Sequence, residues 1–466
     1  MFILFKIFIK HILTMFFEEE NDEAMNFIGE VFAQGDETAD VLNLRRYFLI
    51  HAVIHRRSDI VLDMINKGHL LDIKDDSGNS ALHYAVCSND YGITRLLVEG
   101  GASVNDVNWE GITSLQIAIR NENLEISKYL IENGADIDNT GYKDENIFID
   151  CISSNKINFV KFLLENGANP NILHVNGFSS LHISIQKNFL EITELLLSHG
   201  ADIDYNNALK FIPILHAIMH NKSKLIDLLL RYKPDLDITN IYGENALYYT
   251  VKSNNVNLTK RLLESGANPN IEDILNETPF IVACKNRNME IIKILLSYKA
   301  DINHRDMKGN TALHTACYTS NLDLVKLLIQ NKCCIEVKNN VGSTPFIVAC
   351  TISNANIIKY LIDNKANVNA VNNYGNSGIQ FSVYNGRIDI VLLLIYSGSR
   401  VDFVNTKGDT LAHMACHNRS SDIMRLLVRK GVNIRVRNKD NDLPIDKAER
   451  LNNREIISFL SKLRNN

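Results

Sequence analysis

The chain has 466 residues and a net charge of −5, which argues against a general role in binding nucleic acid. Its composition, 45% hydrophobic and 22% charged, is typical of a soluble folded protein. About three globular domains would be ordinary at this length, but an internal repeat points to an elongated solenoid instead.

Residues 1–17, MFILFKIFIKHILTMFF, form an apolar N-terminal segment in which Lys6, Lys10 and Thr14 follow one another at a spacing of four. The segment is short and interrupted for a transmembrane span, and it lacks the small-residue cleavage site of a signal peptide. Three interpretations remain: an interfacial membrane helix, a helix packed on the first repeat, or an extension upstream of a true start at Met15. The last two are preferred over the first.

The two ends of the chain differ in charge. Residues 18–44 contain nine acidic residues and no Lys or Arg, and we interpret this acidic region as N-terminal and capping. Residues 419–466 contain twelve basic residues and six acidic ones. Both are interpreted as solvated terminal surface rather than as specific electrostatic sites.

From residue 45 to residue 466, one pattern recurs every 33 residues without insertion or deletion. A fixed period of this length indicates stacked copies of one supersecondary unit. The turn position of the pattern is occupied by Gly78, Gly111, Asp144, Gly177, Lys210, Gly243, Asn276, Gly309, Gly342, Gly375, Gly408 and Asn441.

The sequence of each 33-residue unit predicts two short helices. In Thr344-Pro345-Phe346, proline fits the first turn of a helix because its missing N–H would be unpaired there, and threonine can cap the helix. A second apolar run, such as residues 324–329, has the spacing of an amphipathic helix. Gly134 and Gly167, in Gly-Ala-Asp and Gly-Ala-Asn, are expected to end such helices in a left-handed conformation.

Short polar residues are expected to hold a tight turn by bonding their own backbone. They stand three residues before the turn position, as Asp75, Asn108, Asn240, Asp273, Asp306, Asn339, Asn372, Asn405 and Asn438.

Two sets of residues at the 33-residue spacing explain why the units stack. The leucine column fills the layer between helices and comprises Met64, Leu97, Leu130, Leu163, Leu196, Leu229, Leu262, Leu295, Leu328, Leu361, Leu394, Leu427 and Leu460. The small column allows neighbouring helices to approach closely and comprises Ala52, Ala85, Ala118, Cys151, Ser184, Ala217, Thr250, Ala283, Ala316, Ala349, Ser382, Ala415 and Ala448.

These motifs resemble the ankyrin repeat: Gly-x-Thr-Pro-Leu-His-x-Ala, a Leu-Leu second helix, then Gly-Ala-Asp. The resemblance covers about residues 45 to 462 as roughly thirteen units. It implies an all-α solenoid of about 13 helix-turn-helix units with projecting β-turn fingers, stacked into a curved array. The Asn-, Ile- and Lys-rich usage resembles multi-ankyrin proteins of giant DNA viruses, protists or intracellular bacteria.

Some units depart from the pattern. Repeats 1 and 6 shift the motif histidine by one position, to His51 and His216, and repeat 6 replaces Gly-Ala with Lys233-Pro234. Repeat 4 lacks both the turn glycine and the histidine. We interpret repeats 1 and 13 as caps and repeats 4 and 6 as weak points of the stack.

Histidine and cysteine are interpreted as structural. The resemblance implies that His83, His182, His314 and His413 each hold a turn through a hydrogen bond. Equivalent positions of adjacent repeats lie about 10 Å apart, farther than a disulfide allows. Cys284, Cys317, Cys350 and Cys416, which share one column, are therefore expected to be small buried residues in a reducing compartment. Cys333 and Cys334 are expected to be a filler and a surface residue.

The finger tips, the two residues before each turn position, are the candidate functional positions. Stacking does not require large apolar groups there, and Trp, Tyr and Met anchor protein interfaces. The predicted partner-binding residues are Trp109, Tyr142, Tyr242, Leu275, Met307 and Tyr374.

The sequence therefore predicts a monomeric, cytoplasmic scaffold or adaptor that binds partner proteins through the concave face and fingers. A host cytoplasm is expected if the chain is viral or parasitic. We expect no catalysis, cofactor, metal or nucleic acid, since no phosphate loop, dinucleotide fingerprint or catalytic motif is present. Two alternatives remain: a substrate-recruiting adaptor of an enzyme complex such as a ubiquitin ligase, and a membrane-surface anchor acting through residues 1–17.

Overall fold

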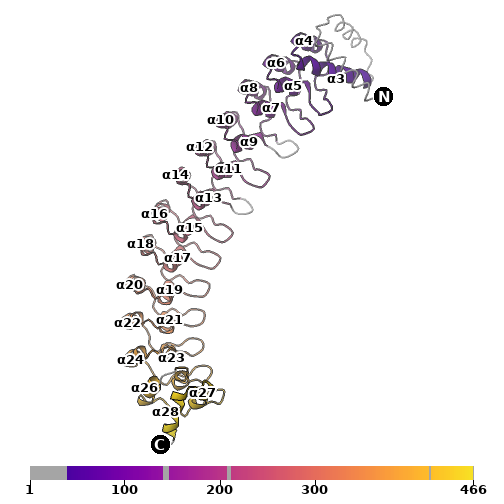
Figure 1. Cartoon of the computed structure of the whole chain (residues 1–466). Helices are drawn as coiled ribbons and strands as arrows, with labels where there is room; N and C mark the ends of the chain where they lie inside the picture. The colour runs from indigo at the N-terminus through magenta and orange to yellow at the C-terminus, as the bar shows by residue number, and fades with distance from the viewer. Residues whose placement is uncertain (1–38, 140–145, 207–210, 419–420, 465–466) are drawn as a thin grey trace. The chain divides into compact units, whose positions relative to one another are not determined.

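A computed structural model describes residues 39–139, 146–206, 211–418 and 421–464 (Figure 1). The apolar segment 1–17 and most of the acidic region 18–44 lie outside the described residues, as does Tyr142. The first described helix begins at Ala39, inside the region interpreted from sequence as acidic and capping. No helix within the described ranges has both the length and the apolar character needed to cross a bilayer.

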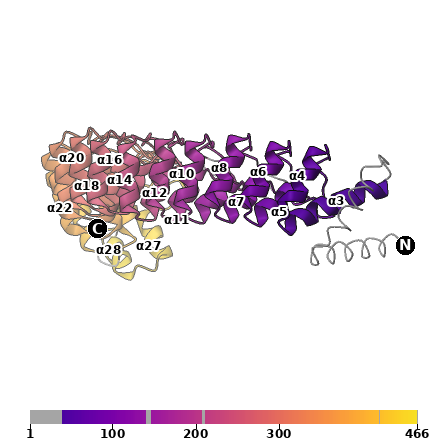
Figure 2. The ribbon, with the colours of Figure 1, turned by 90° about the horizontal axis from the view of Figure 1, so that it is seen from above.

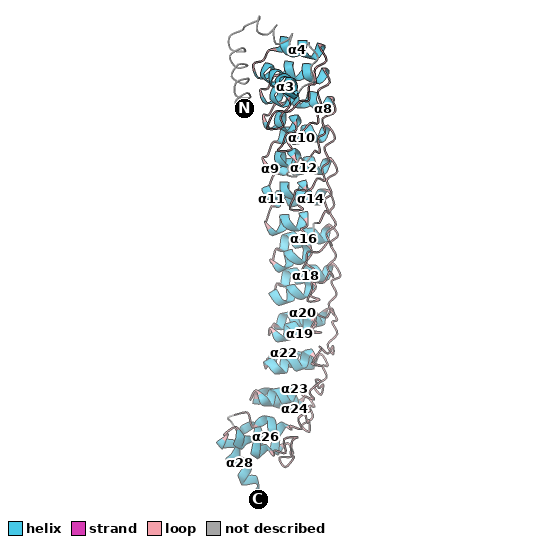
Figure 3. Ribbon diagram, turned by 90° about the vertical axis from the view of Figure 1, so that its right-hand side faces the viewer, coloured by secondary structure: helices cyan, strands magenta, loops and turns pink. Residues whose placement is uncertain are grey.

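The regular secondary structure of the described residues consists of 26 α-helices (Figure 3), which confirms the all-α fold. Only isolated β-bridges, such as that between Val107 and Thr113, occur beside them. The helices form thirteen consecutive pairs, one pair for each 33-residue unit. The odd-numbered member of a pair is called the first helix below, and the even-numbered member is called the second helix.

The chain divides into two compact units, and the division falls within the sixth repeat, between its two helices. Unit 1 contains α3 (Ala39–Ile54), α4 (Ser58–Asn66), α5 (Ala81–Cys87), α6 (Tyr91–Glu99), α7 (Ser114–Arg120), α8 (Leu124–Glu132), α9 (Ile147–Ser153), α10 (Ile157–Glu165), α11 (Ser180–Lys187), α12 (Leu190–Ser198) and α14 (Ser223–Arg231).

Unit 2 contains α13 (Pro213–Met219), α15 (Ala246–Lys252), α16 (Val256–Glu264), α17 (Pro279–Asn286), α18 (Met289–Ser297), α19 (Ala312–Tyr318), α20 (Leu322–Gln330), α21 (Pro345–Ile352), α22 (Ala355–Asp363), α23 (Gly378–Tyr384), α24 (Ile388–Tyr396), α25 (Leu411–Ala415), α26 (Asp422–Arg429), α27 (Pro444–Arg450) and α28 (Arg454–Arg464).

Within each unit the helices form two layers. First helices of adjacent repeats contact one another, as α19 and α21 do, and so do second helices, as α20 and α22 do. In unit 1, α4, α6, α8 and α10 form one row beside α5 and α7 (Figure 2). The loops that precede the first helices project as fingers on the side of the odd-numbered helices (Figure 1).

The two columns predicted from sequence both lie in the core. Every member of the leucine column is at most 3% exposed, and every member of the small column is at most 1% exposed. Small residues bring the first helices close together, and leucine fills the space between the two layers. The repeat-stacking prediction is therefore confirmed for both columns.

The predicted helix ends are also observed. Thr278 and Thr344 cap α17 and α21 by accepting from the backbone N–H of Ile281 and Ile347, and the proline that follows each threonine occupies the first turn. Gly134 and Gly167 have φ of +86° and +93°, the left-handed conformation expected after the second helix.

The predicted polar turns are present in all nine repeats named above. In each, the side-chain oxygen accepts from backbone N–H groups two and four residues later, as Asn339 does from Val341 and Ser343 at 3.2 and 2.9 Å. The other eight behave alike. These bonds give the nine fingers the same base.

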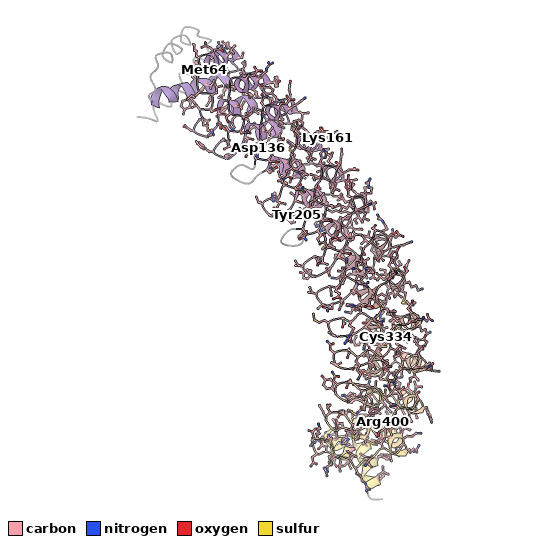
Figure 4. The ribbon with its side chains drawn as sticks, turned by 180° about the vertical axis from the view of Figure 1, so that it is seen from behind. Met64, Asp136, Lys161, Tyr205, Cys334 and Arg400 are labelled. Carbon is pink, nitrogen blue, oxygen red and sulfur yellow. The ribbon has the colours of Figure 1, made fainter. Side chains whose placement is uncertain are left out.

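A second series of polar bonds, not predicted from sequence, links successive repeats. The side chain of Asn105 accepts from the backbone N–H of Asp136, 31 residues later, and donates to the carbonyl of Gly134. In unit 2, Cys334 and Arg400 donate in the same way to Asn303 and Asn369. Figure 4 labels Asp136, Cys334 and Arg400, which occupy equivalent positions.

Because each repeat touches only its neighbours, damage to one layer should remain local. Leu295→Ala, in α18, should lower the free energy of unfolding by about 2–5 kcal/mol, since it leaves a cavity in a fully buried layer. Amide hydrogen exchange should accelerate first in repeats 7–9. Uniform acceleration over the whole chain would contradict this local behaviour.

Candidate protein-binding surface

The finger tips are ordered relative to one another by backbone hydrogen bonds. In unit 2, the N–H of Met307 donates to the carbonyl of Leu275 at 2.9 Å, and that of Asn340 donates to Lys308 at 3.0 Å. The same bond recurs at the following fingers, as between Thr406 and Tyr374. Consecutive fingers of this unit therefore form one continuous surface, and their side chains are free to point outwards.

The structure describes five of the six predicted partner-binding residues, and all five are exposed on finger tips. They do not form a single patch within one unit, because Trp109 belongs to unit 1 and the other four belong to unit 2. Tyr142 lies outside the described residues. Exposure is thus confirmed for Trp109, Tyr242, Leu275, Met307 and Tyr374, whereas their role in binding stays a prediction.

Trp109 has a structural contact that the sequence did not reveal. Its ring is 63% exposed, yet a Cβ placed on Gly78 of the preceding finger would lie only 2.8 Å from two ring atoms. Its backbone N–H also donates to the carbonyl of Ser77. One side of the indole therefore rests on the neighbouring finger, so Trp109 contributes to finger packing as well as to the exposed surface.

Sequence reasoning missed a second exposed column, on the first helices. It lies nine residues after the turn position, near the end of each first helix. Its members in unit 2 are Met219, Lys252, Lys285, Tyr318, Thr351, Tyr384, His417 and Arg450, and all are exposed. The sequence did contain a signal for this column. Its position, two residues after the small column, varies freely in size and charge from repeat to repeat.

Finger tips and first helices meet around a first cavity of about 770 Å³ in unit 2. Leu275 and Met307 enter it from the fingers, and Thr315, Tyr318 and Val348 enter it from α19 and α21. Most of the lining surface is apolar, although most of the lining residues are polar or charged. The structure therefore brings two of the predicted residues together with three that were not predicted.

A second cavity, of about 680 Å³, lies farther along unit 2. Tyr374 of a finger lines it together with Phe381 and Tyr384 of α23, Met414 of α25 and His417. The rings of Tyr384 and His417 are 4.8 Å apart. Both cavities thus lie between the fingers and the first helices, and together they define the finger-side groove of unit 2.

The charges of this groove are arranged unequally. Lys285, which lines the first cavity, is 42% exposed, but the carboxylate that it contacts, Glu277, is only 13% exposed. Lys308 and Lys407 add further exposed cations on the finger tips, and Asp440 adds an exposed acidic group at the second cavity. Exposed cations therefore outnumber exposed acidic groups in the groove.

The comparisons with known proteins agree with this architecture. The family model described as ankyrin repeats (3 copies) matches residues 49–141, 138–207, 204–273, 254–339, 332–403 and 379–466. These matches cover most of the chain. The chain belongs to the ankyrin-repeat family.

Among curated proteins, the chain is similar to the putative ankyrin repeat protein FPV034 of fowlpox virus. The two are 30% identical over 73 residues, which is 16% of this chain and 18% of that protein. The matched part therefore spans less than a fifth of the relative. The viral origin of that protein agrees with the resemblance to viral ankyrin proteins.

The motif histidines of the ankyrin array are used in hydrogen bonds between repeats. Nδ1 of His83 accepts from the backbone N–H of Ser80 at 3.1 Å, so the ring proton lies on Nε2, which donates to the carbonyl of Ile112 at 3.0 Å. His314 and His413 make equivalent bonds. Burial lowers the pKa of all three rings below their usual value, because the charged form is desolvated.

These lowered pKa values predict acid sensitivity of the folded state. Above about pH 6.5 both folded and unfolded histidines are neutral, and the stabilising contribution is complete. As the pH falls through 6.5 towards the folded values, the unfolded chain binds protons that the folded chain does not, so the free energy of unfolding decreases. Urea unfolding at pH 7.5 and pH 5.5 should show this loss.

Glutamine occupies the same position in repeats 3 and 11, so it provides a control for this pH dependence. The triple variant His83→Gln, His314→Gln, His413→Gln should lose stability less steeply between pH 7.5 and 5.5. Any pH dependence of stability that remains would come from other groups, including His417, whose pKa is also lowered by burial. An unchanged slope would show that the three rings do not cause it.

The cysteines of the ankyrin array are free thiols, as expected from their spacing. Cys284, Cys317 and Cys350 are completely buried, and burial raises their thiol pKa values well above the usual range. Cys333 is buried and Cys334 is exposed, which confirms the predicted filler and surface residue. None of the buried thiols is positioned to act as a nucleophile.

Native protein should therefore show two classes of thiol. Cys87 and Cys334, the exposed ones, should react with a disulfide reagent such as Ellman's reagent at pH 8 within minutes. The six buried thiols should react only after unfolding, because the reagent cannot reach them. The double variant Cys87→Ser, Cys334→Ser should lose the fast phase. Rapid modification of six or more thiols would contradict the burial of the cysteine column.

Proposed function

We propose that this chain is a protein-binding scaffold that holds partner proteins in the finger-side groove of unit 2 and catalyses no reaction itself. The observation that carries the proposal is the first cavity, where two independent series of exposed residues converge. Leu275 and Met307 come from the fingers, and Tyr318 comes from the first helices.

The chemistry of the groove supports a protein partner. Large contiguous apolar surface is uncommon on a soluble protein unless it is used for binding. Tyr318 and Met307 are 68% and 57% exposed, and aromatic and methionine side chains are enriched at the centres of protein interfaces. A partner that inserts an apolar side chain between them would remove these groups from water.

The exposed cations favour a partner segment that also carries acidic residues. Lys285, Lys308 and Lys407 extend along the groove from the first cavity to the second, while the paired carboxylate of Glu277 lies beneath Lys285. Charge complementarity of this kind increases the rate of association and helps to select the partner.

The absence of catalysis and the cytoplasmic location belong to the same proposal. His83, His314 and His413 are already bonded at both ring nitrogens, and the column thiols have raised pKa values, so neither group is available as a base or a nucleophile. Eight free cysteines in the chain favour a reducing compartment such as the cytoplasm.

The predicted finger residues of unit 1, Trp109 and Tyr142, are proposed as a further part of the binding surface.

The test requires a partner, which proximity labelling with the full-length chain in its native cell can supply. The purified partner is then titrated against the double variant Met307→Ala, Tyr318→Ala. Affinity should fall about thirtyfold, equivalent to about 2 kcal/mol, as for interface anchor residues. Melting should change little, because both side chains are largely exposed.

Tyr396→Ala is the matched control, because Tyr396 is 78% exposed and lies on the second helix α24, opposite the fingers. It should leave the affinity unchanged. Equal effects of the groove variant and this control would show that the partner does not use the finger-side groove.

A further inference from the structure

Gln380 of α23 occupies the motif position that histidine fills in other repeats, and its amide nitrogen lacks a partner. The residue is 1% exposed. Its Oε1 caps the helix by accepting from the backbone N–H and hydroxyl of Ser377, at 2.7 and 3.1 Å. Its Nε2 makes no hydrogen bond to any described residue. A buried N–H group in this state is uncommon in a folded protein.

The equivalent side chains of other repeats do find a partner in the next repeat. His314 and His413 reach carbonyls 29 residues later, those of Ser343 and Asp442, both at 2.9 Å. Gln116, a glutamine in the same position of repeat 3, donates to the carbonyl of Asn139 at 3.4 Å. Gln116 thus finds an acceptor 23 residues later rather than 29, and Gln380 finds none among the described residues.

A second bond is missing from the same place. In other repeats the residue after the turn position accepts from the asparagine 29 residues later, as Asn310 does from Asn339 at 2.9 Å. Asp409 accepts from Asn438 in the same way at 2.8 Å. The corresponding oxygen, Oδ1 of Asn376, is buried and has no partner among the described residues. Both regular bonds are thus absent between repeats 11 and 12.

The missing bonds coincide with the second cavity. Asn376 and Gln380 both line it, beside the apolar surfaces of Tyr374, Phe381 and Met414. The residues that carry the unused acceptor and the unused donor therefore line the same 680 Å³ space, whereas the two atoms themselves are covered and become reachable only when a neighbouring side chain moves. The nearby carboxylate of Asp409 is engaged by Lys447 at 2.8 Å and by Asn438.

We propose that the second cavity binds the side-chain carboxamide of an asparagine or glutamine in a partner protein segment, flanked by apolar residues. The carboxamide oxygen accepts from Nε2 of Gln380, and its N–H donates to Oδ1 of Asn376. This proposal rests on the proposed function and names the chemistry that one part of the groove recognises.

The two unused groups select a primary carboxamide over a carboxylate, an ammonium group and a main-chain amide. A carboxylate has no hydrogen to give to Asn376, and an ammonium group has no lone pair for Gln380. A trans peptide directs its N–H and its carbonyl to opposite sides of the chain, so one main-chain amide cannot satisfy both groups from one edge. A side-chain amide presents its donor and acceptor side by side.

The test uses the full-length protein and a random dodecapeptide display library as the probe. Selected peptides should be enriched in Asn or Gln with apolar neighbours. In the best peptide, replacing that residue with Asp or Leu should weaken binding at least about tenfold, as for the loss of hydrogen bonds to buried groups. Selection of peptides without Asn or Gln would show instead that main-chain amides or apolar side chains suffice.

Gln380→His is the decisive variant. Histidine should donate to the carbonyl of Asp409, as it does in the other repeats, and so close the site. Peptide affinity should fall about tenfold while the melting temperature is maintained or rises. Gln116→His, in the same position of repeat 3, is the matched control and should leave the affinity unchanged.

A second variant keeps the proposal testable where Gln380→His alters folding. Asn376→Leu removes the acceptor from a residue that is only partly buried, and it should also weaken the peptide. The proposal fails if Gln380→His binds as well as the native chain, or if no peptide is enriched, in which case water satisfies the two groups. Peptides that depend on Tyr318 but not on Gln380 would retain the scaffold function and reject the carboxamide site.

Discussion

The array depends on hydrogen bonds that side chains of one repeat make to the backbone of the next. Burial of the leucine column drives the layers together, but apolar contact has little direction. The ring of His314 reaches the carbonyl of Ser343, and Asn303 reaches the N–H of Cys334, so each repeat is held at a defined position on its neighbour. Because an unpaired buried peptide group is costly, a repeat that slips or rotates loses several of these bonds together.

This constraint determines where the sequence can vary. Positions that stack or bond between repeats tolerate few residue types, whereas finger tips and the end of each first helix need only point away from the stack. The free positions of unit 2 hold Met307, Tyr318 and Tyr374, together with the exposed Lys285, Lys308 and Lys407. The repeat therefore separates stability from recognition within every 33 residues, and one unit can change its binding chemistry without disturbing the next.

Most of the fold could be predicted from the 33-residue period of the sequence. Helix pairs, threonine caps, left-handed glycines and buried columns all follow from local rules applied in one register. The finger residues were found because large apolar groups there serve no packing purpose. What could not be found were contacts that join different repeats, such as the indole of Trp109 resting on Gly78 and the side chain of Asn105 bonding the backbone of Asp136. These depend on which side chains meet across the stack, and one repeat read alone does not contain that information.

Gln116 and Gln380 show the limit of such reasoning most clearly. Both occupy the histidine position, both cap their helix through Oε1, and a sequence pattern treats them as the same substitution. One bonds a carbonyl 23 residues later, and the other leaves its donor unpaired in a residue that lines a cavity. In a periodic protein, a site can be compared with the equivalent positions of the other repeats. A group that departs from its equivalents is therefore more informative than a group that is merely buried or exposed, and the junction of repeats 11 and 12 departs from them twice.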